Sequence, residues 1–309
     1  TLLFRLFIKD WKDTERTDVR AKYGQLSGVV GIFINLLLFV GKYLVGVLSG
    51  SVAICADAVN NLSDAGSSLV SLIAYHISAK PADRQHPFGH ARIEYVASMI
   101  LSFMILFIGI ELLHSSYDKI IHPEGKTAFH IISVIVLVVS ILFKLWLFAF
   151  NRKVGAAIGS TVAEANAADS LSDVLATSSV LISTIVLRFT GFDADGYIGI
   201  VVAIFICISG LKILNDTKNY ILGKAPDAEM IHSIQAIVKR HPEALGMHDL
   251  MIHNYGPGRY FVSLHVEVDG RADIFYTHEV IDNIEKELQQ ELGVFATIHM
   301  DPLVCDDPI

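Results

Sequence analysis

The sequence has 309 residues, of which 52% are hydrophobic, and its mean hydropathy is +0.50. Soluble domains are usually ~45–50% apolar by a count that includes glycine, so the composition argues against an ordinary soluble protein. The formal net charge of −8, with no basic face or tail, argues against a nucleic-acid partner. Cys55, Cys207 and Cys305 are isolated and predict neither a disulfide framework nor a zinc ribbon.

Apolar residues are concentrated in the middle of the chain, which divides it into three parts. A helix needs about 20 mostly apolar residues to cross a bilayer. Six segments meet this need, although the second and fifth carry acidic and amide residues and would be undercounted by hydropathy alone. The expected spans are 25–48, 52–77, 95–113, 129–150, 157–187 and 197–213. The expected domains are a cytoplasmic N-terminal arm (1–24), a transmembrane transport domain (25–220) and a cytoplasmic domain (221–309).

Basic residues predict the orientation of these spans. Lys and Arg gather in the N-terminal arm and in the loops that follow the second, fourth and sixth spans, whereas the opposite loops hold only Lys119, Lys126 and Arg188. The positive-inside rule therefore predicts that both termini are cytoplasmic in a multi-pass plasma-membrane protein. No apolar segment with a cleavage site begins the chain, so no cleaved signal peptide is expected. Residues 10–22 form either an amphipathic helix on the membrane surface or a solvated helix.

Two segments in the second and fifth spans resemble each other. Residues 57–64 read Asp-Ala-Val-Asn-Asn-Leu-Ser-Asp, and residues 166–173 read Asn-Ala-Ala-Asp-Ser-Leu-Ser-Asp. Residues four apart on a helix share a face, so each segment predicts a pair of oxygen-bearing side chains. If the two helices pack together, these pairs form one site. Its predicted members are Asn60, Asp64, Asp169 and Asp173.

Carboxylates inside a membrane are costly, and three of them together repel one another. A bound divalent cation offsets most of this cost, and protons can replace the cation when it leaves, which is the physical basis of metal/proton exchange. The alternative is that the polar residues hold helices together while the carboxylates face a water-filled crevice. Asp57 and Asn166 lie seven residues before the last Asp of each segment, and could line the path or complete an octahedral shell.

The chain resembles the cation diffusion facilitator family over nearly its whole length. The resemblance lies in the six spans, the paired motifs, the loop Pro-Ala-Asp-Arg-Gln-His-Pro-Phe-Gly-His at 81–90, and His-Met-Asp-Pro at 299–302. It implies that the paired motifs form the transport site, that the tail is a ferredoxin-like, metallochaperone-like α/β domain, and that the protein is a homodimer. Zinc-carrying members usually have histidine in the paired motifs. The paired motifs of this chain contain no histidine, and in this respect the chain resembles the bacterial manganese-exporting branch.

Ligand chemistry also favours manganese. Carboxylate and carbonyl oxygens suit Mg²⁺, Ca²⁺ and Mn²⁺, whereas imidazole suits Zn²⁺. Mg²⁺ loses its water reluctantly and Ca²⁺ prefers larger oxygen cages, so Mn²⁺ is the expected substrate. Zn²⁺ or Fe²⁺ remains the alternative, because Mn²⁺ is the weakest binder in the Irving–Williams order. No catalytic cofactor is expected.

The hydrophilic tail predicts a small α/β sandwich. Its periodicities indicate a helix at 228–239, strands at 246–255 and 260–268, a helix at 274–292 and a strand at 294–300. In the family, residues matching His248, His278, His299 and Asp301 bind metal, so a tail site that acts in regulation or dimer stability is expected there. His299 and Asp301 share one face of a strand. His253 and His265 have no motif support and are left out of the site.

The loop between the second and third spans carries a second candidate site. Residues matching Asp83, His86 and His90 bind metal in relatives, and the alternative is a Pro/Gly turn with imidazoles that face solvent. Arg92 and Glu94 follow and are expected to hold the membrane domain against the tail.

Two other classes of protein fit less well. An intramembrane metalloenzyme needs a base beside an open metal, but the spans hold no H-E-x-x-H and no Ser/His or Cys/His pair. A channel needs rings of ligands with weak multi-site binding. A compact four-ligand site instead suits alternating access, so we expect a metal/proton antiporter rather than an enzyme.

Overall fold

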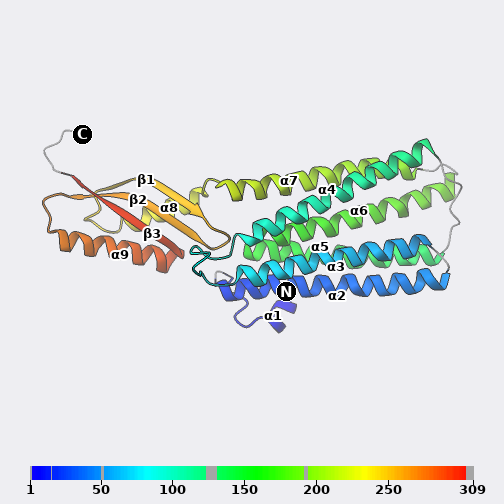
Figure 1. The fold of residues 1–309 in the computed structure, drawn as a ribbon, viewed down its shortest axis with the longest axis horizontal. Helices are drawn as coiled ribbons and strands as arrows, with labels where there is room; N and C mark the ends of the chain where they lie inside the picture. The colour runs from blue at the N-terminus through cyan, green and yellow to red at the C-terminus, as the bar shows by residue number, and fades with distance from the viewer. Residues whose placement is uncertain (1, 15, 50–51, 123–130, 191–193, 304–309) are drawn as a thin grey trace. The chain divides into compact units, whose positions relative to one another are not determined.

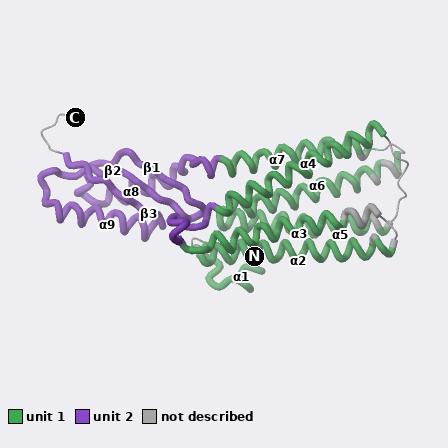
Figure 2. The backbone as a smooth tube through the Cα atoms, viewed as in Figure 1, with its two compact units in different colours: residues 1–81, 93–218 green, residues 82–92, 219–309 purple. Residues whose placement is uncertain are grey.

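The computed structural model describes residues 2–14, 16–49, 52–122, 131–190 and 194–303. It divides into two compact units, one formed by Thr1–Pro81 and Ile93–Lys218 and the other by Ala82–Arg92 and Asn219–Ile309 (Figure 2). The loop between the second and third expected spans therefore belongs to the unit that contains the tail. The boundaries expected at 24/25 and 220/221 stay predictions.

The first unit is a bundle of helices that run side by side, with one short helix beside it (Figure 1). Its described helices are α1 (Leu2–Phe7), α2 (Thr17–Ser49), α3 (Val52–Ser78), α4 (Ile93–Ile121), α5 (Ile131–Ile158), α6 (Thr161–Thr190) and α7 (Asp195–Leu222). Within 10–22 the chain is helical only from Thr17 onward, because the described residues from 9 to 14 are not helical, so the single helix expected over 10–22 was wrong in its first half.

Within the described residues, four helices are long and apolar enough to cross a membrane. They include Asp18–Val45 of α2, Ile93–Ile121 of α4, Val134–Ile158 of α5 and Gly196–Leu222 of α7. The mainly helical class is thus confirmed. α3 and α6, which were also expected to be spans, are not among these four helices, because their polar residues lower their hydropathy.

Polar residues of α3 and α6 lie inside the bundle, and apolar residues of the other helices lie outside. Ser67 and Ser71 of α3 and Ser170 of α6 are buried, whereas Phe107 of α4 is 68% exposed. Small side chains allow the helices to approach closely: a Cβ at Gly28 of α2 would lie 2.8 Å from Leu72 Cβ. This distribution is the reverse of that in a soluble protein and is typical of helices packed in lipid.

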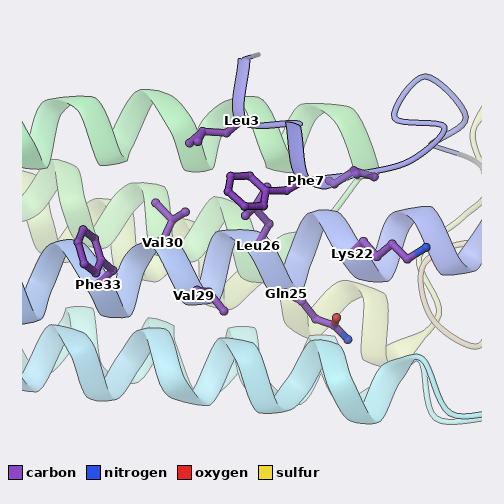
Figure 3. A pocket seen from close by; sticks show the side chains of 9 residues that line it. Leu3, Phe7, Lys22, Gln25, Leu26, Val29, Val30 and Phe33 are labelled. Carbon is purple, nitrogen blue, oxygen red and sulfur yellow. The ribbon is translucent and has the colours of Figure 1, made fainter. Parts of the chain in front are cut away.

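An apolar groove lies between α1 and the first half of α2 (Figure 3). Lys22 and Gln25 bring polar groups to a wall that is otherwise made of aliphatic and aromatic side chains. The apolar lining consists of Leu3, Phe7, Ile8, Leu26, Val29, Val30 and Phe33. The short helix therefore covers only part of the apolar surface of α2.

The tail is a three-stranded sheet with two helices. Its elements are α8 (Ala228–Val238), β1 (Gly246–Asn254), β2 (Tyr260–Asp269), α9 (Ile274–Leu292) and β3 (Val294–Leu303). β2 is central, antiparallel to β1 and parallel to β3. Val262, Leu264 and Val266 of β2 are buried in a core with Ile234 of α8 and Ile284 of α9. The helices therefore cover one face of the sheet, and the alternate residues of β2 lie on the other face.

Candidate metal centres

The two halves of the repeated motif bring three carboxylates together. One oxygen each of Asp64 (α3), Asp169 and Asp173 (α6) lies within 4.8 Å of the others. Asp64 is 5% exposed, and α3 packs directly against α6. The pair on α6 points the same way because its members are four residues apart. We call these three residues the carboxylate cluster.

A lysine that the sequence analysis did not consider lies in this cluster. Lys144 of α5 donates from Nζ to Asp64 Oδ2 at 2.6 Å and to Asp173 Oδ2 at 2.5 Å. Its side chain is 2% exposed. The signal was present in the sequence, since Lys144 is the lone charged residue of the apolar segment 131–151. An isolated charge in a membrane helix usually has a partner inside the bundle.

The amide hydrogen-bonded to Asp64 belongs to Asn61 rather than to Asn60. Asn61 is buried and donates from Nδ2 to Asp64 Oδ2 at 3.3 Å, whereas Asn60 is exposed. Among the described residues, Asn61 Oδ1 has no hydrogen-bond partner. Residues three apart on a helix also share a face, so Asn61 could have been found from spacing. The ligand role expected of Asn60 stays a prediction.

The structure does not place the two outer residues of the motif, Asp57 and Asn166, in the carboxylate cluster. The side chain of Asp57 lies outside the described residues. Asn166 is buried and exchanges hydrogen bonds with Ser71 of α3, at 2.8 Å from its Nδ2 and 3.0 Å to its Oδ1. Asn166 therefore ties α3 to α6, as the alternative helix-packing interpretation expects.

The loop between α3 and α4 brings its three predicted residues together. Asp83 Oδ1 accepts from the backbone N–H of His86 at 2.7 Å and of Gln85 at 2.9 Å. His86 Nδ1 and His90 Nε2 lie 3.5 and 3.4 Å from the Asp83 carboxylate. The hydrogen bond from His86 N, together with that from Gln85, lowers the pKa of Asp83. The carboxylate is therefore ionised and available to a cation.

The same loop packs on the tail within the second unit. The Phe88 ring stacks on Tyr255 at 4.2 Å, and Arg92 Nη2 donates to Asn254 O at 2.8 Å. Arg92 also lies 4.1 Å from the centre of the Tyr255 ring. Arg92 thus contacts the tail within the second unit, so its expected role of holding the membrane domain against the tail stays a prediction, whereas the same expectation for Glu94 was wrong.

Glu94 is instead held inside the helical unit. Its Oε1 accepts from Arg20 Nη1 at 2.8 Å and Ser78 Oγ at 2.8 Å, and its Oε2 accepts from Arg20 Nη2 at 3.1 Å and Ser160 Oγ at 3.0 Å. The side chain of Glu94 is 1% exposed. The two residues are neighbours in sequence, but the division between the units falls between them.

Three histidines form a row across the open face of the tail sheet. His248 of β1 pairs with His265 of β2, which pairs with His299 of β3. Asp301 Oδ2 lies 2.9 Å from His265 Nδ1 and 3.0 Å from His248 Nε2, and Asp301 Oδ1 lies 3.3 Å from His299 Nε2. The hydrogen bond from His265 lowers the pKa of Asp301. These four side chains are a candidate metal site, which we call the tail cluster.

A β-bulge adds a second carboxylate beside the tail cluster. The register of β1 shifts between His248 and Met251, where Asp249 has a φ of 48°. Asp249 Oδ2 lies 3.4 Å from His248 Nδ1. Asp is among the residues that tolerate this left-handed conformation. Asp249, His248 and His265 form a triad that shares His265 with the triad of His265, His299 and Asp301.

The central ligand candidate of the tail was therefore missed, and one predicted candidate lies elsewhere. His265 was left out because it had no motif support, and the strand register that brings it to the cluster is not readable from spacing alone. His278 is exposed on α9, which packs against the opposite face of the sheet. The structure does not bring it to the tail cluster, and a ligand role for His278 stays a prediction.

The apolar helices, the buried carboxylate cluster and the two histidine clusters together define a membrane transporter of metal ions. Residues 28–222 match the family model of the cation efflux transmembrane domain, and residues 226–303 match that of the cation efflux protein cytoplasmic domain. The chain belongs to this family, the cation diffusion facilitators.

Its relatives carry the names of metal efflux proteins. The manganese efflux system protein MneS of Bacillus subtilis is 27% identical, over 94% of this chain and 99% of that protein. The cation-efflux pump FieF of Shigella flexneri is 29% identical, over 91% and 94%. An uncharacterized transporter of Methanocaldococcus jannaschii is 28% identical, over 88% and 96%. The family is shared across these chains, whereas identities of this size leave the metal open.

Proposed function

We propose that this member of the family exports a divalent transition metal, with Mn²⁺ as its main substrate, in exchange for protons. The observation that carries the proposal is the convergence of Asp64, Asp169 and Asp173 inside a bundle of membrane helices. Three carboxylates in so small a space need a positive charge. A divalent cation on one side of the membrane and protons on the other supply that charge in turn.

The choice of Mn²⁺ rests on the ligand atoms. Among the described residues, the carboxylate cluster contains oxygen ligands and neither imidazole nor thiolate. Such a site favours a hard cation and reduces the advantage of zinc. The name of one relative, the manganese efflux system protein MneS, agrees with this choice. The name cation-efflux pump, which FieF carries, specifies no metal. Zn²⁺ or Fe²⁺ is the second candidate, because Mn²⁺ is the weakest binder in the Irving–Williams order.

We further propose six spans with both termini in the cytoplasm of a plasma-membrane protein. α3 and α6 have 27 and 30 residues. At 1.5 Å per residue they are about 40 and 45 Å long, enough to cross a hydrocarbon core of about 30 Å. Many of their polar side chains, such as Asn61, Ser71 and Asn166, are buried, which reduces the penalty of placing them in lipid.

In the proposed cycle, the metal enters from the cytoplasm when the three carboxylates are ionised. The helices then rearrange so that the same site opens outward, and external protons displace the metal. Asn60 and Asn61 are the amides that can complete the ligand set from α3. The metal is the substrate, and each step is a change in what neutralises the carboxylate cluster.

The tail and the loop act in regulation and assembly in this proposal. The order helix, strand, strand, helix, strand supports a ferredoxin-like domain, and the cytoplasmic-domain match supports a homodimer. The loop triad of Asp83, His86 and His90 and the tail cluster would bind metal from the cytoplasm. Because both contain imidazoles, they need not hold the transported metal.

Flux into proteoliposomes with an imposed pH gradient tests the proposal. We expect Mn²⁺ to enter faster than Zn²⁺, Fe²⁺ or Mg²⁺ in wild type, and Asp173→Ala to remove the flux. Wild-type flux in Asp173→Ala would contradict the site, flux without response to the gradient would contradict the exchange, and Zn²⁺ flux without Mn²⁺ flux would contradict the selectivity.

A further inference from the structure

The ammonium group of Lys144 occupies the point where two of the three carboxylates converge. Its Nζ lies 2.6 Å from Asp64 Oδ2 and 2.5 Å from Asp173 Oδ2. These distances are those of short, charge-assisted hydrogen bonds. The lysine reaches the cluster from α5, whereas the carboxylates come from α3 and α6. A third helix therefore delivers a fixed positive charge to the candidate transport site.

This position overlaps that of a transported ion. A divalent metal binds carboxylate oxygens at about 2.0–2.2 Å, so an ion that uses the same two oxygens would lie within the space now filled by Nζ. Even if the ion used the other oxygen of each carboxylate, two cations a few ångströms apart would repel strongly in a buried site. The ammonium and the metal are thus alternative occupants.

The remaining charges around the cluster do not remove this conflict. Lys42 of α2 is buried and close enough to act electrostatically on Asp173, so it adds positive charge. Asp169 is the third negative charge, and its oxygen lies within the same 4.8 Å. Asn61 Oδ1, which has no hydrogen-bond partner among the described residues, offers a neutral acceptor next to Asp64 for whichever cation is present.

We infer that Lys144 is a tethered competitor of the transported metal: its ammonium leaves Asp64 and Asp173 when the ion binds and returns when the ion is released. The inference rests on the proposed function. If the ammonium and the metal exchange in this way, a cation stays close to the carboxylates while the site changes from facing one side of the membrane to facing the other. A competitor lowers the apparent affinity in proportion to the fraction of time that it leaves the site free. It also speeds release, because it neutralises the carboxylates as the metal departs.

Removing the competitor should therefore tighten binding and slow turnover. If the ammonium occupies the site about nine-tenths of the time, Lys144→Met lowers the metal dissociation constant about tenfold. The factor is the same for Mn²⁺ and Zn²⁺, because competition for the oxygens does not depend on which ion replaces the ammonium. In transport, the half-saturating concentration and the maximal rate should both fall.

The test is equilibrium binding of radioactive Mn²⁺ and Zn²⁺ to the purified full chain, together with proteoliposome flux. Binding to Asp173→Asn is subtracted, so that ions held by the loop and the tail do not count. Lys144→Gln, which keeps a neutral donor of similar length, replaces Lys144→Met if the latter does not fold. Lys218→Met is the control, because Lys218 is exposed and bonded to Asn215 on its own helix.

Tighter binding of both metals by a similar factor, with a lower maximal rate and an unchanged control, supports the inference. Unchanged or weaker binding overturns it, and so does a gain confined to one metal, which would make Lys144 a selectivity residue. These results are separate from the fate of the proposed function. That function fails if Asp173→Asn transports as wild type does, whereas the inference alone fails if Asp173→Asn is inactive but Lys144→Met binds metal as wild type does.

Discussion

Two groups of buried charges in the helical unit differ in how well they are compensated. The Glu94 carboxylate accepts four hydrogen bonds, two from Arg20 and one each from Ser78 and Ser160. The carboxylate cluster has three carboxyl groups, and the ammonium of Lys144 bonds to two of them. Asp64 and Glu94 are both buried in the same unit, so burial alone does not mark a functional site.

The difference indicates which group is structural and which is ready for a ligand. A buried carboxylate with every lone-pair direction satisfied gains little from an added cation. A cluster with excess negative charge remains strained unless a further cation or protons arrive. We therefore assign Glu94 to holding the helices together and the carboxylate cluster to transport, and the following experiments test this contrast.

The largest effect is expected on metal transport when a residue of the carboxylate cluster is replaced. Asp64→Asn removes one charged ligand with little change of shape and should reduce metal flux by at least about a hundredfold, above the 10–100-fold typical for groups that only support a ligand. Flux per folded protein in proteoliposomes measures it. Glu94→Gln is the matched control, since it removes one buried carboxylate elsewhere, and an equal loss of flux in both variants would end the contrast.

The second largest effect is expected on stability, when the ion pair between Arg20 and Glu94 is broken. Arg20→Met leaves a buried carboxylate without its partner, which typically costs about 3–5 kcal/mol. We expect a clear fall in the melting temperature of the purified protein and an unchanged metal dissociation constant in the fraction that stays folded. The double variant Arg20→Met with Glu94→Gln should lose less than the sum of the single changes, because the partners are coupled. Additive losses would mean that the pair does not act as a unit.

A smaller and local effect is expected in the tail. His265→Gln should weaken metal binding to the tail cluster by about 10–100-fold, because His265 belongs to both triads. His278→Gln is the comparison variant, and it should change binding much less because His278 is not in the cluster. Binding in an Asp173→Ala background reports on these sites without the transport site. A larger loss in His278→Gln would return His278 to the ligand set.

The smallest effect concerns the pH at which the loop and tail release metal. The pKa values of Asp83 and Asp301 are lowered by hydrogen bonds to their carboxylates, so both stay ionised at mildly acid pH. Each carboxylate stabilises its folded cluster above its ordinary pKa, and that contribution is lost only when the pH falls through the lowered value. Metal release between about pH 7 and 5 therefore cannot come from protonation of these two carboxylates.

Metal titrations of the Asp173→Ala protein at several pH values measure this release. Metal retained down to pH 4.5 would show that carboxylates dominate both sites. Release that shifts when Asp301→Asn replaces the carboxylate, while the imidazoles stay in place, would show that the carboxylate titrates within this range.

Local periodicity explains what the sequence could predict. The repeated motif placed Asp64, Asp169 and Asp173 correctly because helical spacing fixes which side chains share a face. The tail elements also matched their patterns, since each was decided by residues close in sequence. Three of the four tail residues that the family resemblance implied, His248, His299 and Asp301, lie in one cluster.

Contacts between elements explain what was missed. Lys144 reaches the carboxylate cluster from a third helix, and His265 joins the tail cluster through the register of strands distant in sequence. Neither depends on a local pattern. Arg92 and Glu94 show the same limit, because two neighbours in sequence make their contacts in different units.

The loop of residues 82–92 makes the second unit part of the path between two bundle helices. The chain passes between the units three times, after Pro81, after Arg92 and after Lys218. Two of these passages lead directly into α3, which carries Asp64, and α4. Truncation after Lys218 would remove Tyr255 and Phe261, on which Phe88 packs. The loop would then lack these packing contacts. A tail-deleted protein would therefore lose the packing partners of the segment that connects α3 to α4.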